Sequence, residues 1–277
     1  MVLESLINPF KAEKKPWEMF FIGFAYSSVA ILLSMWIFKQ HASLVMVFLT
    51  VMACIPLIYS TIKLEEEKDL IIKKEKILLK EHGRALSFFI FLFFGITISF
   101  TLWYTLLPQS AAQSLFSIQA QTIADINNQI TGNQINPTML FTKIFLNNMK
   151  VLVFCILFAF VYGAGAIFIL TWNASVIAAA IGNFIRANLN STHLFHGYFQ
   201  IASVGILRYS IHGIPEMLAY FTAGLAGGII SIAVIKHDFG SKKFTHILTD
   251  SADLLIISVA ILLVAALIEV YITPVLF

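Results

Sequence analysis

The sequence predicts an all-α protein: a polytopic transmembrane helical bundle with about six spans and with short or re-entrant helices in residues 172–212. Of the 277 residues, 59% are hydrophobic and only 12% are charged, whereas a soluble domain carries about 25% charged residues. The mean hydropathy of +0.86 also indicates a lipid environment. The apolar residues form continuous runs near the roughly 20 residues that a membrane-crossing helix needs, not the alternating pattern of a membrane β-barrel.

The apolar runs predict six clear spans. We expect the first to be retained in the mature protein, because it follows a charged segment and lacks the small-residue site of a cleaved signal. The spans are Phe20–Phe38, Ser43–Ile62, Leu86–Leu107, Met149–Thr171, Ile214–Ile235 and Leu254–Thr273.

Basic residues predict the orientation of these spans. Three lysines precede the first span, and seven Lys and Arg residues lie between Lys63 and Arg84. The stretch from Pro108 to Phe141 contains none. Because loops rich in Lys and Arg stay on the cytoplasmic side, we expect a multi-pass protein of the cell membrane with a cytoplasmic N-terminus.

This orientation requires one more membrane crossing than the six clear spans provide. Met149–Thr171 and Ile214–Ile235 should both run inward, so the chain must return outward between them. The apolar stretches available there, Ala174–Ile185 and Gly197–Tyr209, are short. Irregular backbone at membrane depth is tolerated only where protein or a wet cavity surrounds it, and paired short segments often mark transporter sites.

We expect residues 1–277 to form a single integral membrane domain with two water-exposed parts. Residues 63–84 should form a cytoplasmic region of helical arms that extend the second and third spans, either as a solvated connector or as a docking surface for a protein partner. Residues 108–147 are rich in Gln, Asn, Ser and Thr and should form an extracytoplasmic loop or cap.

Polar side chains within spans usually face the bundle interior, and the sharpest group is His212-Gly213-Ile214-Pro215-Glu216. His212 and Glu216 share one helix face, and Pro215 suits a first turn. The pair could hold helices together, carry a proton or an ion, or bind a metal together with His196. A polar core or pathway would comprise Asn147, Asn148, Trp172, Asn173, His212, Gly213 and Glu216.

Two further features concern the spans. Gly224, Gly227 and Gly228 follow Glu216 at a spacing that lets helix backbones approach closely, and Gly163 and Gly165 are their natural complement. No strand precedes them, so a nucleotide-binding glycine loop is excluded. Glu269 should be a solvated or hydrogen-bonded carboxylate near the outer interface.

With these residues in view, the chain resembles the stage II sporulation protein M family of bacterial and archaeal membrane proteins. The resemblance rests on Asn147-Asn148 opening a span, on a Gly163-containing helix that ends in a Thr171-Trp172-Asn173 turn, and above all on residues 212–216 and 223–227. It covers roughly residues 147–236. It implies a scaffold-like role, because the founding member resembles a scaffold for a complex that remodels septal peptidoglycan.

Three functions remain open. The first is a channel or transporter-like conduit for an ion or small polar solute, in a homo-oligomer. The second is a membrane scaffold that docks a protein partner through residues 63–84. The third is an intramembrane metal-dependent hydrolase using Glu216, His212 and His196.

The sequence favours a non-enzymatic role, because it contains no HExxH motif, nucleophile elbow or P-loop. It identifies no cofactor. A net charge of +3 without a basic block interleaved with aromatic residues excludes a nucleic-acid partner. The lipid bilayer is the expected partner.

Overall fold

The computed structural model describes residues 15–72, 74–131, 136–189, 195–237 and 240–276, and within these ranges it is helical without strands. Seven of the described helices are long and apolar enough to cross a membrane, so the all-α polytopic class is confirmed. The long helices are α3 (Glu18–Ile37), α4 (Ala42–Ile71), α5 (Glu75–Leu106), α8 (Pro137–Tyr162), α9 (Ala166–Leu189), α10 (Phe195–Lys236) and α11 (Lys242–Leu267). The short elements are η1 (Lys39–His41), α6 (Gln109–Leu115), α7 (Ser117–Thr131), the π-helix η2 (Ile268–Ile272) and α12 (Thr273–Leu276).

The predicted single span Met149–Thr171 is wrong, because a turn divides it. α8 ends at Tyr162, Gly163 takes a φ of 67°, and α9 begins at Ala166. This backbone conformation favours glycine. Gly165 also packs so closely on the Phe158 carbonyl that a Cβ has no room there. Since the turn consists of Gly-Ala-Gly, it leaves the apolar run unbroken, and hydropathy alone could not locate it.

α9 supplies the crossing that the sequence-based topology lacked, so the described chain has seven candidate spans rather than about six. Ala174–Ile185 lies inside α9 and Gly197–Tyr209 inside α10, so the short or re-entrant helices expected in residues 172–212 are not found in the described part of that range. α10 is one helix of 42 residues, and Pro215 lies in its interior rather than in a first turn. The expected turn at residues 171–173 is likewise an internal part of α9.

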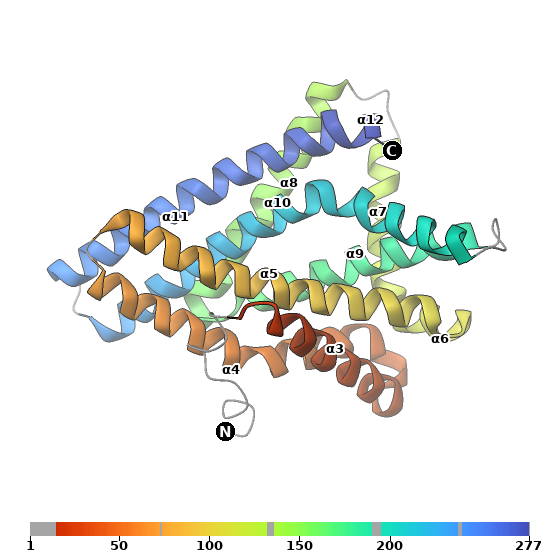
Figure 1. Ribbon diagram of the computed structural model, residues 1–277, viewed down its shortest axis with the longest axis horizontal. Helices are drawn as coiled ribbons and strands as arrows, with labels where there is room; N and C mark the ends of the chain where they lie inside the picture. Colours follow the sequence, from red (N-terminus) through yellow and green to blue (C-terminus); the bar gives the residue numbers. More distant parts are fainter. Residues whose placement is uncertain (1–14, 73, 132–135, 190–194, 238–239, 277) are drawn as a thin grey trace.

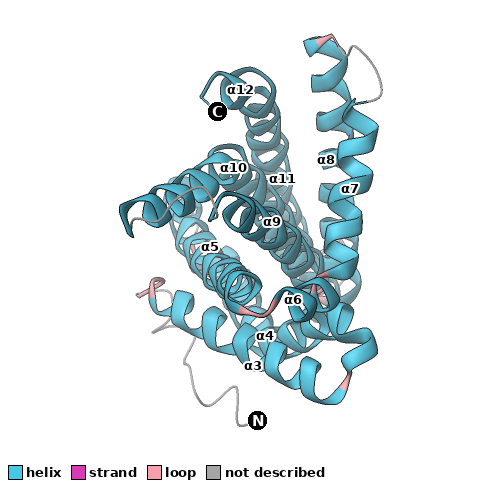
Figure 2. Ribbon diagram, turned by 90° about the vertical axis from the view of Figure 1, so that its right-hand side faces the viewer, coloured by secondary structure: helices cyan, strands magenta, loops and turns pink. Residues whose placement is uncertain are grey.

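α10 lies in the middle of the bundle. Figure 1 shows α3, α4, α5, α9, α10 and α11 running broadly along the long axis of the molecule, and α10 packs against α8, α9 and α11. Seen along the bundle, α7 and α8 stand to one side of the other helices (Figure 2). α8 therefore begins away from the bundle and converges on α10 toward the Gly163 turn.

The two regions expected outside the spans are largely helical. α4 continues to Ile71 and α5 begins at Glu75, so the 63–84 region extends these two helices. The 108–147 region contains α6, α7 and the start of α8. Buried Gln119 holds α7 on the bundle, because its Oε1 accepts from Ser43 Oγ at 2.7 Å and its Nε2 donates to Ser175 Oγ at 3.2 Å.

A close crossing joins α3 to α5. A Cβ added at Gly95 would collide with the Phe20 carbonyl, and one added at Gly23 would collide with the Leu92 carbonyl. Ser28 Oγ and Ser99 Oγ lie 3.0 Å apart beside this crossing. Small residues thus bring the two backbones together, and a polar contact adds to the packing.

We predict that Gly95→Leu destabilises the protein by at least about 1–3 kcal/mol, because the larger side chain forces α3 away from α5. Thermal unfolding in detergent micelles should show a lower midpoint. Gly83→Ala is the matched control, since no atom lies within 4 Å of a Cβ at Gly83, and it should leave the midpoint unchanged or raise it slightly. Equal midpoints for Gly95→Leu and wild type would contradict the steric role of this crossing.

Candidate functional site

Glu216 lies on α10 at mid-membrane depth. A Cβ on Gly228 of α10 would meet the Ile62 side chain of α4, next to the first charged residue of the arm region, Lys63. Glu216 is twelve residues before Gly228, which is about 18 Å along a helix. Because the hydrocarbon core is about 30 Å thick, this places Glu216 near its centre.

Glu216 is held by its own helix. The Tyr220 hydroxyl, one turn further along α10, donates to Glu216 Oε1 at 2.9 Å. Tyr220 is fully buried, so this bond fixes the carboxylate against the interior of the bundle. Tyr220 stands four residues after Glu216 in the sequence, a spacing that brings two side chains together on one helix face, but the sequence analysis did not single it out.

The second carboxylate of the site comes from the π-helix η2. Thr273 follows η2 directly and lies beside His212 of α10, and Glu269 stands four residues before Thr273. Because α11 packs along α10, Glu269 lies at about the level of Glu216. A π-helix shifts the residues that follow it onto a different face, and such segments are frequent at functional sites. Hydropathy predicts neither the π-helix nor the position of Glu269 relative to Glu216.

His212 extends the site by one turn in the other direction along α10. Its Nδ1 lies 3.4 Å from Thr273 Oγ1, at the junction of η2 and α12. Thr273 also donates to the Ile268 carbonyl at 3.2 Å. We call Glu216, Tyr220, Glu269, His212 and Thr273 the Glu216 cluster.

The asparagines singled out in the sequence lie at about the same height. α9 runs antiparallel to α10, since Gly224 meets Ala166 and Gly205 meets Phe184, so Asn173 lies level with residue 217. Its Nδ2 is buried and has no hydrogen-bond partner. On α8, Asn148 is buried and lies roughly level with Tyr220, because Gly227 packs on Ile156.

The remaining predicted polar residues form no hydrogen bond with the cluster among the described residues. Asn147 is exposed and Trp172 packs against the core. Gly213 is buried, yet nothing lies within 4 Å of a Cβ there.

The predicted metal site includes His196, whose side chain lies outside the described residues. On α10, His196 stands sixteen residues before His212, which is about 24 Å along the helix axis. The described residues also contain no group of three or more His, Cys, Asp or Glu that could hold a metal.

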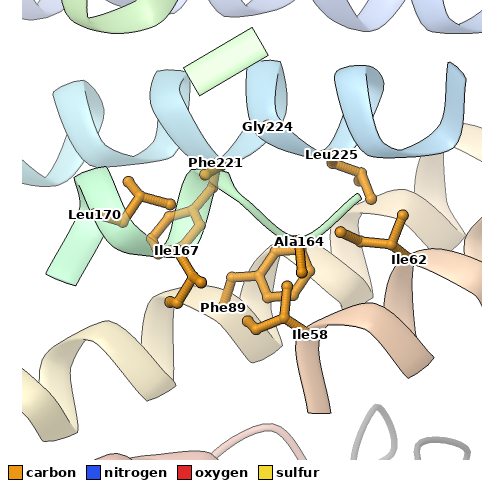
Figure 3. A pocket seen from close by; sticks show the side chains of 10 residues that line it. Ile58, Ile62, Phe89, Ala164, Ile167, Leu170, Phe221, Gly224 and Leu225 are labelled. Carbon is orange, nitrogen blue, oxygen red and sulfur yellow. The ribbon is translucent and has the colours of Figure 1, made fainter. Parts of the chain in front are cut away.

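The glycines on α10 lie between the Glu216 cluster and Lys236, the last residue of the helix. Gly227 packs on the Ile156 carbonyl of α8, Gly228 on the Gly163 carbonyl of the turn, and Gly224 on Ala166 of α9. Gly224 also lines a small apolar pocket, together with Phe89, Phe221 and other apolar side chains (Figure 3). No member of the Glu216 cluster lines this pocket.

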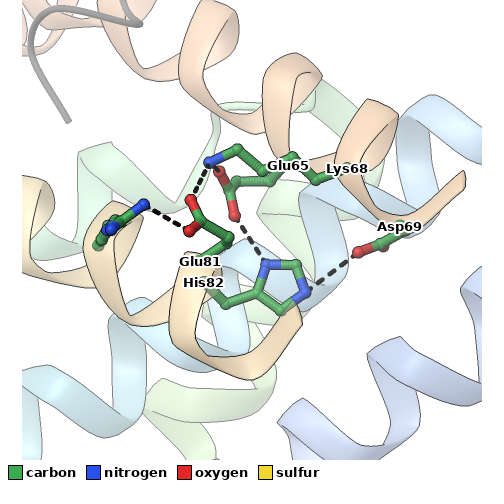
Figure 4. A network of polar contacts seen from close by, with 6 residues as sticks. Glu65, Lys68, Asp69, Glu81 and His82 are labelled. Carbon is green, nitrogen blue, oxygen red and sulfur yellow. Dashed lines mark hydrogen bonds and ion pairs between the residues drawn. The ribbon is translucent and has the colours of Figure 1, made fainter. Parts of the chain in front are cut away.

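A second polar group, which the sequence analysis treated as a solvated connector or docking arm, is buried where α4 and α5 meet α10 and α11. His82 lies between two carboxylates, with Nδ1 2.7 Å from Glu65 Oε2 and Nε2 3.1 Å from Asp69 Oδ1 (Figure 4). These side chains are at most 3% exposed. With a carboxylate beside each ring nitrogen, the surroundings favour the positively charged imidazolium.

The same group ties α10 to α4. Glu66 is fully buried and lies 2.6 Å from Lys236 Nζ and 2.8 Å from His237 Nε2. Lys68 pairs with Glu65 at 2.5 Å. We call these residues the ionic cluster and the end of the bundle that holds them the ionic end. The seven residues are Glu65, Glu66, Lys68, Asp69, His82, Lys236 and His237.

Comparison with known proteins identifies a family. The model of the family described as stage II sporulation protein M matches residues 87–274, more than half of the chain. The match spans the whole Glu216 cluster and begins after His82. No curated protein and no solved structure matches the chain.

We predict that His82→Gln destabilises the protein by about 3–5 kcal/mol, because it leaves two buried carboxylates without their shared positive partner. Thermal unfolding in micelles would show this as a lower midpoint. Arg84→Gln is the control: it removes a cation whose pair with Glu81 is half exposed, which should cost less than about 1 kcal/mol. Similar midpoints for the two variants would argue against a buried ionic cluster.

Proposed function

Because the chain belongs to the stage II sporulation protein M family and is a multi-pass membrane protein, we propose that it moves an ion or a small polar solute across the membrane through the Glu216 cluster. The observation that carries this proposal is Glu216 at mid-membrane depth, which accepts a hydrogen bond from Tyr220 and has no cationic partner among the described residues. We orient the chain with its N-terminus and the ionic end in the cytoplasm, as the positive-inside rule predicts.

The free-energy cost of burying these polar groups favours a conduit over a purely structural role in holding the helices together. Hydrogen bonds between membrane helices are worth about 0.6 kcal/mol on average, and neutral side chains suffice to make them. A charged carboxylate at the bilayer centre costs at least about 2.5 kcal/mol, so such residues usually mark ion or substrate pathways. Two carboxylates at one height, with His212 and Tyr220 alongside, exceed what helix packing needs.

The asparagines are consistent with a pathway. Asn173 presents a buried amide donor with no partner, level with the carboxylates. A polar solute, an ion's water shell or a carboxylate could accept from it. Asn148 on α8 supplies another polar group at about this height. Several helices therefore contribute polar atoms to one level of the bundle.

We predict that Glu216→Gln abolishes flux through the protein. The chain would be reconstituted in liposomes, and the release of trapped cations and the movement of protons would be followed with ion-selective dyes. Glu18→Gln makes the same chemical change at an exposed carboxylate and should retain wild-type flux. Undiminished flux in Glu216→Gln, or no flux in wild type above protein-free liposomes, would contradict the proposal.

A scaffold is the second candidate, favoured by exposed apolar side chains at the ionic end. Ile71 is 76% exposed at the end of α4, and Ile77 and Leu79 near the start of α5 are about half exposed. These residues lie beyond the apolar stretches of their helices, so a protein partner could cover them. The family resemblance to a scaffold agrees with this reading.

The scaffold predicts that Ile71→Gln combined with Ile77→Gln removes a stoichiometric partner from complexes purified from native membranes. Liposome flux should be unchanged, since the Glu216 cluster lies elsewhere. A matched variant, Leu32→Gln with Val29→Gln, alters apolar residues about half exposed on α3 and should retain the partner. Retention of every stoichiometric partner by the arm variant would speak against docking at this surface.

A further inference from the structure

We propose that two copies of this chain pair through the outward face of α8, along a seam of six residues at coiled-coil spacing. All six are exposed within α8. The α8 seam consists of Lys143, Asn147, Lys150, Phe154, Leu157 and Val161. This inference goes beyond the proposed function and does not depend on whether the chain conducts.

α8 buries only the face that it turns toward the bundle. The buried residues of this helix are Asn148, Leu152, Cys155 and Ala159. The α8 seam lies on the opposite face, which the other described helices leave exposed. Figure 2 agrees with this, because α8 stands to one side of the bundle with α7 beside it. In the membrane, this face must meet either lipid or another protein.

Lys150 makes lipid a poor neighbour for the α8 seam. It stands thirteen residues after the start of α8 at Pro137 and twelve before its end at Tyr162, so it lies near the middle of a candidate membrane span. A lysine near a helix end can extend its amine to the interface, but one at the centre of a span is costly in hydrocarbon. Lys150 forms no hydrogen bond or ion pair with another described residue.

The spacing of the α8 seam identifies a second copy as the partner. Its residues follow one another at intervals of four, three, four, three and four, which is the alternation by which like helices pack in a left-handed pair. Copies inserted into the membrane in the same way have parallel α8 helices, related by a two-fold axis along the membrane normal. Such an axis brings the same face of both copies together.

Asn147 and Lys150 are complementary across this axis. If Asn147 is assigned to an a position of the heptad, Lys150 takes the d position that follows. The Lys150 amine of one copy can then donate to the Asn147 side-chain carbonyl of the other, and the symmetry repeats this bond. A polar residue at an a position also fixes the register and the number of helices. Closer to the Gly163 turn, the rest of the α8 seam is apolar.

Disulfide trapping of the full-length protein in liposomes tests the α8 seam. Phe154→Cys places a thiol on it, and we expect a covalent dimer after mild oxidation with copper phenanthroline. Val29→Cys is the matched control, because Val29 of α3 and Phe154 are both 54% exposed but lie on different helices. The native Cys54 and Cys155 are buried and should not cross-link.

We predict that Asn147→Leu weakens the dimer, because it removes both symmetric hydrogen bonds and keeps a side chain of similar size. The dissociation constant in the bilayer should rise about five- to tenfold for the loss of two interhelical hydrogen bonds. Single-molecule photobleaching of labelled protein over a range of protein-to-lipid ratios measures this constant. Asn147→Gln retains the amide and should stay closer to wild type. The thermal midpoints of both variants should match wild type, since the changes lie on an exposed face.

Three results would overturn the inference: cross-linking of Phe154→Cys no greater than that of Val29→Cys, an Asn147→Leu dimer as tight as the wild-type dimer, or a number of bleaching steps per particle other than two at high protein-to-lipid ratio. Failure of the conduit is a separate outcome. If wild type dimerises as predicted but moves no ion or solute in liposomes, the pairing of α8 stands and the proposed function falls.

Discussion

A charged side chain in hydrocarbon costs several kcal/mol, and this cost sorts the buried acidic groups of the chain into two kinds. At the ionic end, Glu65, Glu66 and Asp69 are buried beside cationic partners within 3.1 Å. At mid-membrane depth, Glu216 accepts a hydrogen bond from the Tyr220 hydroxyl and forms no ion pair within the described chain. The first kind is balanced by fixed charge, whereas the second has a neutral hydrogen-bond donor as its partner.

α10 physically joins these two sites. It carries Glu216 near its middle and Lys236 at its end, and between them its glycines bring it into contact with α8, α9 and the Gly163 turn. About 30 Å of continuous helix separates Lys236 from Glu216.

The sequence predicted the class of fold, because composition is a local signal, and the spacing of His212 and Glu216 singled out one face of α10 for the same reason. It failed where a prediction depended on tertiary contact. The Gly163 turn is made of small residues that leave hydropathy unchanged, and the contact of His212 with Thr273 joins residues far apart in the chain. The ionic cluster was missed for the same reason: a charged helical arm has the same composition whether it is solvated or buried, and only packing against α10 tells the two apart.

The turn at Gly163 also bears on how the chain is made. Machinery that inserts helices according to their hydrophobicity meets residues 149–171 as one apolar stretch, long enough to cross alone. If that stretch crossed as one helix, α10 and α11 would enter the bilayer with inverted sidedness, and the ionic cluster could not assemble because Lys236 and Glu66 would emerge on opposite faces. Correct biosynthesis of the second half of the protein thus depends on a three-residue turn forming within a segment that, read alone, is a complete transmembrane signal.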